Sequence, residues 1–131
     1  MINHITVRVS DLEKSIEFFS HILAPLGYKL VKTGDHSAGF AIEDVDGKRD
    51  FWIRIGGSKS DNHSFSCIAF TATSKQMVED FYKAGLEAGG KDNGVPGYRP
   101  KYTPGYYAAF ILDPDGHNIE TVFDDPAGFP K

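Results

Sequence analysis

Residues 106–123 read Tyr-Tyr-Ala-Ala-Phe-Ile-Leu-Asp-Pro-Asp-Gly-His-Asn-Ile-Glu-Thr-Val-Phe, and two apolar runs flank the central Asp-Pro-Asp-Gly. Proline presets one backbone torsion of a turn and glycine adopts the other freely, so this stretch predicts a β-hairpin. Side chains alternate between two faces of a strand, which puts Asn118, Glu120 and Val122 together. A carboxylate among apolar neighbours costs free energy unless it is paired, so Glu120 is a candidate site residue.

The bulk composition excludes several classes of function. The chain has 131 residues, 40% of them hydrophobic and 24% charged, which is ordinary for one globular domain. A formal net charge of -4 and the lack of a basic run argue against a nucleic-acid partner. No apolar run is long enough to span a membrane, and the single cysteine, Cys67, cannot form an internal disulfide. We therefore expect a cytoplasmic protein.

The first half of the chain predicts a strand, a helix and three more strands. Residues 2–9 alternate as a strand, and Ser10-Asp11-Leu12-Glu13 predicts a capping box in which Ser10 and Glu13 cap the next helix. That helix carries one apolar stripe and ends at Pro25 and Gly27. The remaining expected elements are strands at 28–33, 38–44 and 50–55, a turn at 45–48 and a linker at 56–63.

The second half predicts the same order of elements. A strand at 66–72 is followed by a helix that Thr73 or Ser74 caps and that ends at Gly89-Gly90. The apolar face expected for this helix consists of Met77, Val78, Phe81, Tyr82 and Leu86. Residues 91–105 are rich in Pro and Gly, so we expect mainly loop there, with at most a short strand. The hairpin 106–123 and an irregular tail at 124–131 complete the chain.

A shift of 63 positions (67 minus 4) aligns the two halves. It matches core and cap positions: His4 with Cys67, Ser10 with Thr73, Phe18 with Phe81, Phe19 with Tyr82, Leu23 with Leu86 and Gly27 with Gly90. We therefore predict two β-α-β-β-β modules, at about residues 1–57 and 64–124, in a single α+β domain over residues 1–131. Neither module could bury its sheet alone, so the two sheets should form a curved, cup-like mixed sheet with the helices on its convex face.

Strand alternation predicts which side chains line the cup. If the helices cover Ile5, Val7 and Val9, then His4 faces the hollow, and the repeat places Cys67 there as well. Glu120 should face the same way, which brings an imidazole, a thiol and a carboxylate together. All three are acceptable ligands of Zn²⁺, whereas a ferrous site usually takes two histidines and one carboxylate.

The chain resembles the vicinal oxygen chelate superfamily, which includes glyoxalase I, extradiol dioxygenases, fosfomycin-resistance thiol transferases and bleomycin-binding proteins. The resemblance covers nearly the whole chain and rests on residues 4–11, 67–70 and 113–120, of which the last are the most specific. It implies a divalent metal held by a His of the first strand, a His opening the mid-chain strand and a Glu after the Asp-Pro-Asp-Gly turn. His4 and Glu120 match these positions, and Cys67 stands in place of the second His.

Two positions depart from the family pattern. A thiolate at Cys67 could keep Zn²⁺ but would be a poor substitute in an iron dioxygenase, and His63 is a candidate replacement. Glyoxalase I takes a second carboxylate from the strand that matches residues 50–55. Counting from the turns equates Phe51 with Glu120, whereas burial puts Phe51, Ile53 and Ile55 under the helix and leaves Asp50, Trp52 and Arg54 in the cup. We favour the second alternative, because an arginine beneath a helix would be costly.

Other residues are candidates for contact with a substrate. Tyr107 is the candidate proton donor beside a metal-bound oxyanion. The candidate lining of the pocket is Trp52, Arg54, Tyr98, Arg99 and Tyr106, in which an arginine could meet an anionic group. The structural alternatives are a salt bridge from Glu120 to Arg8 or Arg54, an inert buried thiol at Cys67, and tyrosines that belong to the core.

Three functions remain open. The resemblance implies an enzyme that uses a divalent metal, with Zn²⁺ most compatible and Mn²⁺, Ni²⁺ or Fe²⁺ as options, to chelate vicinal oxygens of a small substrate. Such a metal would stabilise an oxyanion or enolate in a lyase, isomerase or dioxygenase reaction. The second is a metal-free binding protein that sequesters an aromatic or cationic compound, and the third is a scaffold. The resemblance also implies a homodimer, in which some family members share a site between copies.

Overall fold

The computed structural model describes residues 2–42, 50–56 and 66–128. In the first module the elements are β1 (Ile5–Val9), α1 (Leu12–Leu23), η1 (Ala24–Leu26), β2 (Lys29–Thr33), β3 (Ser37–Ala41) and β4 (Phe51–Ile55). In the second they are β5 (Cys67–Thr71), α2 (Lys75–Glu87), β6 (Lys91–Tyr98), β7 (Tyr106–Leu112), β8 (Asn118–Asp124) and η2 (Pro126–Gly128). The expected turn at 45–48 and linker residues 57–63, with His63, lie outside the described residues.

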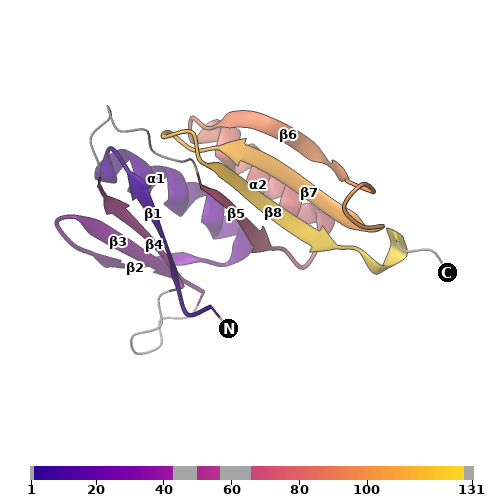
Figure 1. The fold of residues 1–131 in the computed structure, drawn as a ribbon, viewed down its shortest axis with the longest axis horizontal. Helices are drawn as coiled ribbons and strands as arrows, with labels where there is room; N and C mark the ends of the chain where they lie inside the picture. Colours follow the sequence, from indigo (N-terminus) through magenta and orange to yellow (C-terminus); the bar gives the residue numbers. More distant parts are fainter. Residues whose placement is uncertain (1, 43–49, 57–65, 129–131) are drawn as a thin grey trace.

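Each module forms a four-stranded mixed sheet, in the order β1-β4-β3-β2 or β5-β8-β7-β6. The first and last strands of each module pair in parallel, and the other neighbours are antiparallel. The identical orders confirm the α+β class and the predicted repeat of two β-α-β-β-β units. Figure 1 shows the two sheets side by side, with α1 and α2 behind them. Among the described strands, β1 and β5 are edge strands that do not pair with each other.

The N-termini of the two helices are capped by side chains. The Asp11 carboxylate accepts a hydrogen bond of 3.1 Å from the Lys14 amide, so the prediction that Ser10 caps α1 was wrong by one residue. The Ser74 hydroxyl caps α2 by accepting a bond of 3.2 Å from the Met77 amide, as one of the two predicted alternatives. None of the described helices is long and apolar enough to cross a membrane.

The core lies between the helices and the sheets and is continuous across both modules. The Phe51 ring of β4 lies 5.1 Å from the Phe19 ring of α1 and 5.3 Å from the Phe70 ring of β5. Leu86 is 43% exposed, so its predicted place in the apolar face of α2 was wrong. The buried side of this helix turn carries small residues instead, because a Cβ on Gly85 would lie only 2.8 Å from Ile111 of β7.

Residues 91–98 form the edge strand β6, so the prediction of mainly loop was wrong there. The strand pairs with β7 through two register shifts, one between Asp92 and Gly94 and one between Gly94 and Gly97. Pro96 falls within the second shift, where it need not donate to the ladder. Glycine and proline therefore mark a bulged edge strand in this segment rather than the absence of one.

Candidate functional site

Glu120 lies buried on the open face of the second sheet, which we define as the face turned away from α2. It pairs with Ala69 of β5 and with Phe110 of β7, and it is 6% exposed. Its carboxylate accepts a hydrogen bond from the Tyr106 hydroxyl. This bond explains how an apolar strand accommodates the carboxylate that the sequence singles out.

Tyr106 shares the open face with Glu120. Ala108 lies between Tyr106 and Phe110 on this face of β7, and its small side chain leaves room for the tyrosine ring to extend along the sheet. Burial, together with the hydrogen bond to Glu120, raises the pKa of Tyr106 far above its usual value of 10.0. The hydroxyl therefore keeps its proton at neutral pH and acts as a donor. Tyr102 packs edge-on against the same ring at 5.1 Å.

Cys67 faces the same side of the neighbouring strand. It is exposed, so the alternative of an inert buried thiol was wrong. Its Sγ accepts a hydrogen bond of 3.1 Å from the Asn118 amide group, and the Asn118 side-chain oxygen accepts one of 2.9 Å from Asn93. Glu120 and Cys67 are thus two potential metal donors on one surface, two pairs apart along the β5–β8 ladder.

His4 lies just before β1, exposed, with its Nδ1 2.9 Å from the Asn3 side-chain oxygen. Within residues 2–42, 50–56 and 66–128, no three His, Cys, Asp or Glu side chains are grouped so that they could hold a metal. The types of donor predicted from the sequence suit Zn²⁺. Within the described part of one chain, however, His4 does not form a metal site with Glu120 and Cys67.

The register of the strands settles which residue of the first module corresponds to Glu120. Thr6 pairs with Trp52, just as Ala69 pairs with Glu120, and the repeat matches Thr6 with Ala69. Phe51 and Ile53 are buried with the core, as the favoured alternative predicted, whereas Ile55 is 40% exposed, so its predicted place under the helix was wrong. The first module therefore holds an indole where glyoxalase I would need its second carboxylate. Arg54 is exposed and pairs with Arg8 in the ladder. The ion pairs found among the described residues do not include one between Glu120 and either arginine.

Arg99 reaches the open face from the segment that follows β6. Its guanidinium carbon lies 5.3 Å from the centre of the Phe110 ring, and one nitrogen donates a hydrogen bond of 2.6 Å to the Val95 carbonyl. Gly94 makes room for this arrangement, since a Cβ there would lie 2.7 Å from the Phe110 ring. Because Phe110 pairs with Glu120, a cation and a carboxylate flank one aromatic ring.

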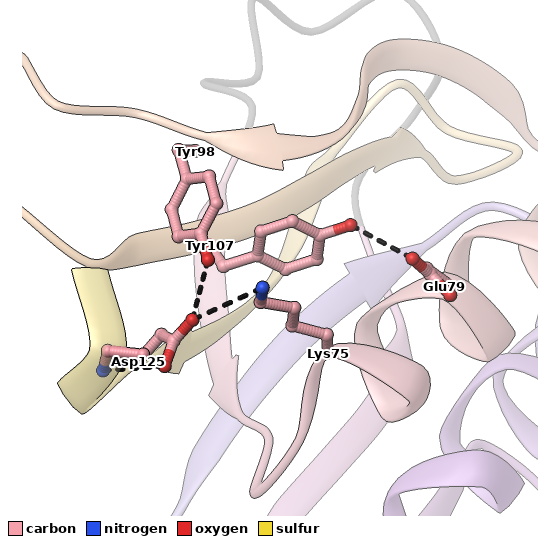
Figure 2. A network of polar contacts seen from close by, with 6 residues as sticks. Lys75, Glu79, Tyr98, Tyr107 and Asp125 are labelled. Atoms are coloured by element: carbon pink, nitrogen blue, oxygen red, sulfur yellow. Dashed lines mark hydrogen bonds and ion pairs between the residues drawn. The ribbon is translucent and has the colours of Figure 1, made fainter.

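Tyr107 and Tyr98 lie on the opposite, helix-covered face, so their predicted place in the cup was wrong. The Tyr107 hydroxyl donates to Glu79 of α2 at 3.0 Å, and the Tyr98 hydroxyl donates to Asp125 at 2.6 Å (Figure 2). The sequence reasoning also missed Phe110. Counting outward from the hairpin turn, in which Leu112 pairs with Asn118, would have identified Phe110 as the partner of Glu120 and placed Tyr106 on the same face.

A cleft of about 590 Å³ lies between the edge strands β1 and β5. Its lining is mainly apolar and includes Ile5, Ile68 and Phe70. The polar lining residues are Asn3, Tyr28, Asp50 and Thr71. Burial, with a smaller contribution from the charge of Asp50, raises the pKa of Tyr28. The volume is in the range of sites for small molecules.

The two banks of the cleft belong to different modules. Asn3 and Ile5, which flank His4 in the chain, line one bank. Ala69, which pairs with Glu120, lines the other. The cleft therefore lies between the segment that carries His4 and the strand that pairs with Glu120.

The Asp-Pro-Asp-Gly turn ties the two modules together. The Nε2 of His117 lies 2.8 Å from the Arg8 carbonyl of β1, while its Nδ1 accepts a bond of 2.9 Å from the Ser66 amide. The Asp115 carboxylate accepts bonds of 3.1 and 3.2 Å from the Ser10 amide. Both contacts join the hairpin of the second module to the first, one at β1 and the other at the residue that follows it.

The sequence of the chain is similar to a known protein family and to two metallothiol transferases. The family model of the Glyoxalase/Bleomycin resistance protein/Dioxygenase superfamily matches residues 1–121. Metallothiol transferase FosB of Lysinibacillus sphaericus is 31% identical over 125 residues, which cover 91% of this chain and 79% of that protein. FosB of Shouchella clausii is 29% identical over 126 residues, which cover 91% of this chain and 77% of that protein.

Solved structures agree with the family match. A glyoxalase/bleomycin resistance protein from Albidiferax ferrireducens superimposes with a TM-score of 0.77 and 26% identity, over 92% of this chain and 97% of that chain. The fosfomycin resistance protein FosX of Listeria monocytogenes, complexed with Mn(II) and 1S,2S-dihydroxypropylphosphonic acid, gives a TM-score of 0.66. It is 20% identical over 93% of this chain and 88% of that chain, so it supports the fold.

Proposed function

Because the chain belongs to the glyoxalase/bleomycin resistance protein/dioxygenase superfamily, we propose that it is a small-molecule enzyme with its reaction centre on the open face around Glu120. The observation that carries this proposal is the buried Glu120 carboxylate, which shares its surface with Cys67. These two side chains would hold a divalent ion, with His4 of a second copy as the third ligand. The ion, when bound, would supply Lewis-acid stabilisation of negative charge on a substrate oxygen.

The assignment of His4 to a second copy follows from the edges of the sheets. Within the described residues of one chain, His4, Cys67 and Glu120 do not form a metal site. Strands β1 and β5 each leave one edge unpaired, and such edges readily pair with another chain. A homodimer in which β1 of one copy lies along β5 of the other would bring His4 to the open face. An isologous dimer would contain two such sites.

The chain's own residues would bind and orient the substrate. Tyr106 would hold Glu120 in place by donating its one hydroxyl proton to the carboxylate. Arg99, held over Phe110, would meet an anionic group of the substrate. The phosphonic acid bound to FosX and the transferase name of the FosB relatives support a small anionic substrate and a group-transfer reaction. Trp52 and Arg54 of the first module are proposed to complete the lining.

Metal analysis combined with complementation tests this proposal. Protein purified without a His tag should bind about one Zn²⁺ or Mn²⁺ per chain, and both His4→Ala and Glu120→Ala should lose it. Mixing and refolding the two variants together should restore about a quarter of the sites, because random pairing makes half of the dimers mixed and each mixed dimer has one intact site. No recovery on mixing would contradict a shared site. No binding by the unmodified protein would contradict the metal-dependent enzyme.

A second candidate is a metal-free binding protein for an aromatic or cationic compound. The observation that favours it is the hydrogen bond from Tyr106, which satisfies Glu120 without an ion. The apolar cleft beside Ala69 would supply the binding volume. A ligand that raises the melting temperature of metal-free protein, with no metal bound at micromolar supply, would favour this candidate.

A further inference from the structure

A second polar network lies on the helix-covered face of the sheet (Figure 2). The Asp125 carboxylate accepts a bond of 2.6 Å from the Tyr98 hydroxyl and lies 3.4 Å from the Lys75 ammonium. This ammonium is 4.9 Å from the centre of the Tyr98 ring and 5.6 Å from that of Tyr107. Tyr107 in turn donates to Glu79 at 3.0 Å. Helix α2, strands β6 and β7 and the end of β8 thus meet at one cluster.

The network and the open face share two short pieces of backbone. Tyr98 and Tyr107 belong to the network, and their chain neighbours Arg99 and Tyr106 belong to the open face. Tyr98 pairs with Tyr107, and the Arg99 amide donates a bond of 2.7 Å to the Tyr106 carbonyl. Because consecutive side chains of a strand point to opposite faces, fixing the inner rings fixes the backbone from which the outer side chains leave.

Asp125 also holds the turn that precedes Tyr106. Its backbone amide donates a bond of 2.8 Å to the Gly105 carbonyl, and the carboxylate accepts one of 2.9 Å from the Ala127 amide. The chain after Asp125 then packs closely on this turn, since a Cβ on Gly128 would lie 2.6 Å from the Gly105 Cα. Asp125 is 5% exposed. The hydrogen bond from Tyr98, with smaller effects of the Ala127 amide and Lys75, lowers its pKa, so the carboxylate is ionised at neutral pH.

We propose that Asp125 is a positioning residue for the reaction centre: through Tyr98, Tyr107 and Gly105 it fixes the direction in which Tyr106 reaches Glu120. Part of this inference rests on the proposed function, because it takes Glu120 as the centre of the site. The structural part concerns Tyr106 alone and holds whether or not a metal binds. A merely structural Asp125 would affect folding without a specific effect on the Tyr106 hydroxyl.

Fluorine NMR of protein labelled with meta-fluorotyrosine tests the structural part. The resonance of Tyr106 is identified by its loss in Tyr106→Phe. Asp125→Asn should shift or broaden this resonance, whereas Asp35→Asn, which removes the same charge from an exposed turn, should leave it unchanged. If Asp125→Asn does not fold, Lys75→Met, which removes an exposed partner of the same carboxylate, takes its place. An unchanged Tyr106 resonance in a folded variant would overturn the inference.

A double-mutant cycle on Zn²⁺ affinity tests the connection to the site. Asp125→Asn should weaken binding by roughly tenfold in the otherwise unmodified protein, as changes in the groups that orient a metal ligand do. The same change in a Tyr106→Phe background should have little further effect, because both act through one hydroxyl. Losses that simply add in the double variant would overturn the positioning role. If no variant binds Zn²⁺, the proposed function fails, and the fluorine spectrum still decides whether Asp125 positions Tyr106.

Discussion

The first module places Trp52 where the second module places Glu120, although both residues pair with matched positions on a parallel neighbouring strand. The repeat also aligns His4 with Cys67, so two exposed, matched positions carry an imidazole in one module and a thiol in the other. The two modules otherwise have the same order of strands, and a helix of each packs against the other. The repeat therefore supplies the framework twice, whereas a buried carboxylate at this position occurs only in the second module.

This difference shows that equivalent backbone positions do not imply equivalent chemistry. Trp52 offers a large apolar surface and one N–H donor, so it can bind a substrate but cannot ligate a cation. Cys67 and Glu120 can do both. A site that needs donors from both modules therefore depends on how β1 of the first is placed against β5 of the second. The predictions below test where the two modules are alike and where they differ.

The largest expected effect is on stability and concerns the apolar faces of the two helices. The repeat matches Leu23 with Leu86, but Leu23 is fully buried and Leu86 is 43% exposed. Leu23→Ala should lower the free energy of unfolding by about 3 kcal/mol, because it leaves a cavity. Leu86→Ala should cost about 0.5 kcal/mol or less, as exposed positions do. Urea denaturation of both variants measures this, and equal losses would contradict the observed packing of α2.

The next effect concerns metal preference. Cys67→His gives both modules an imidazole at the matched position, and it exchanges a soft thiolate for a harder nitrogen donor. The preference for Zn²⁺ over Ni²⁺ should narrow by roughly tenfold in a competition titration. Cys67→Ser, which removes the thiol without adding a strong ligand, should weaken the binding of both ions. An unaltered preference in Cys67→His would exclude residue 67 as a ligand.

A smaller effect is expected from the hydroxyl that satisfies Glu120. Tyr106→Phe leaves the buried carboxylate without its donor and should cost about 1–2 kcal/mol of unfolding free energy in metal-free protein. Tyr102→Phe is the control, because Tyr102 packs on the same ring but is 61% exposed. Thermal denaturation of the two variants should separate them. Equal melting temperatures would mean that the Tyr106–Glu120 bond does not form in solution.

The smallest effect concerns Asp113 in the turn that joins the modules. Burial raises the pKa of this carboxyl above its usual value of 3.8, despite the opposing influence of His117. The folded state then binds the proton more tightly than the unfolded state, so stability falls as pH rises from 3.8 through the raised pKa. Asp113→Asn removes this cost and should be relatively more favourable at neutral pH than at about pH 4.

Melting curves of Asp113→Asn and of the control Asp35→Asn at the two pH values measure the effect. The control accounts for the loss of one carboxylate at an exposed position. A larger relative benefit for Asp113→Asn in acid would contradict the direction of the pKa shift.

Most of the framework could be predicted from the sequence because it depends on local signals. The order of elements follows from apolar periodicity, and the repeat follows from matched core and glycine positions. The error at residues 91–98 has a physical cause, since Gly94 and Pro96 are turn signals in isolation but also occur in a bulged edge strand. The error at Leu86 arose because a helical stripe does not show how far a helix extends beyond the sheet it covers.

The site was harder to predict because it depends on register and on contacts between strands. An alternating strand allows two assignments of its faces. The burial argument correctly placed Trp52, and not Phe51, on the open face. The prediction of Tyr107 as the proton donor was wrong because the alternation of side chains along β7 places Tyr106, and not Tyr107, on the same face as Glu120. The placement of His4 relative to Glu120 depends on how two separate sheets meet, and no local pattern in the sequence encodes that.

The bulged edge strand β6 has a consequence for solubility. An edge strand with regular geometry is a template for adding further strands, and unlimited addition leads to aggregation. The register shifts and the proline of β6 interrupt that template at the outer edge of the second sheet. The pairings of β1 and β5 with their neighbours show no such shifts. The unshifted edges of β1 and β5 therefore keep the regular template for strand pairing that β6 has lost.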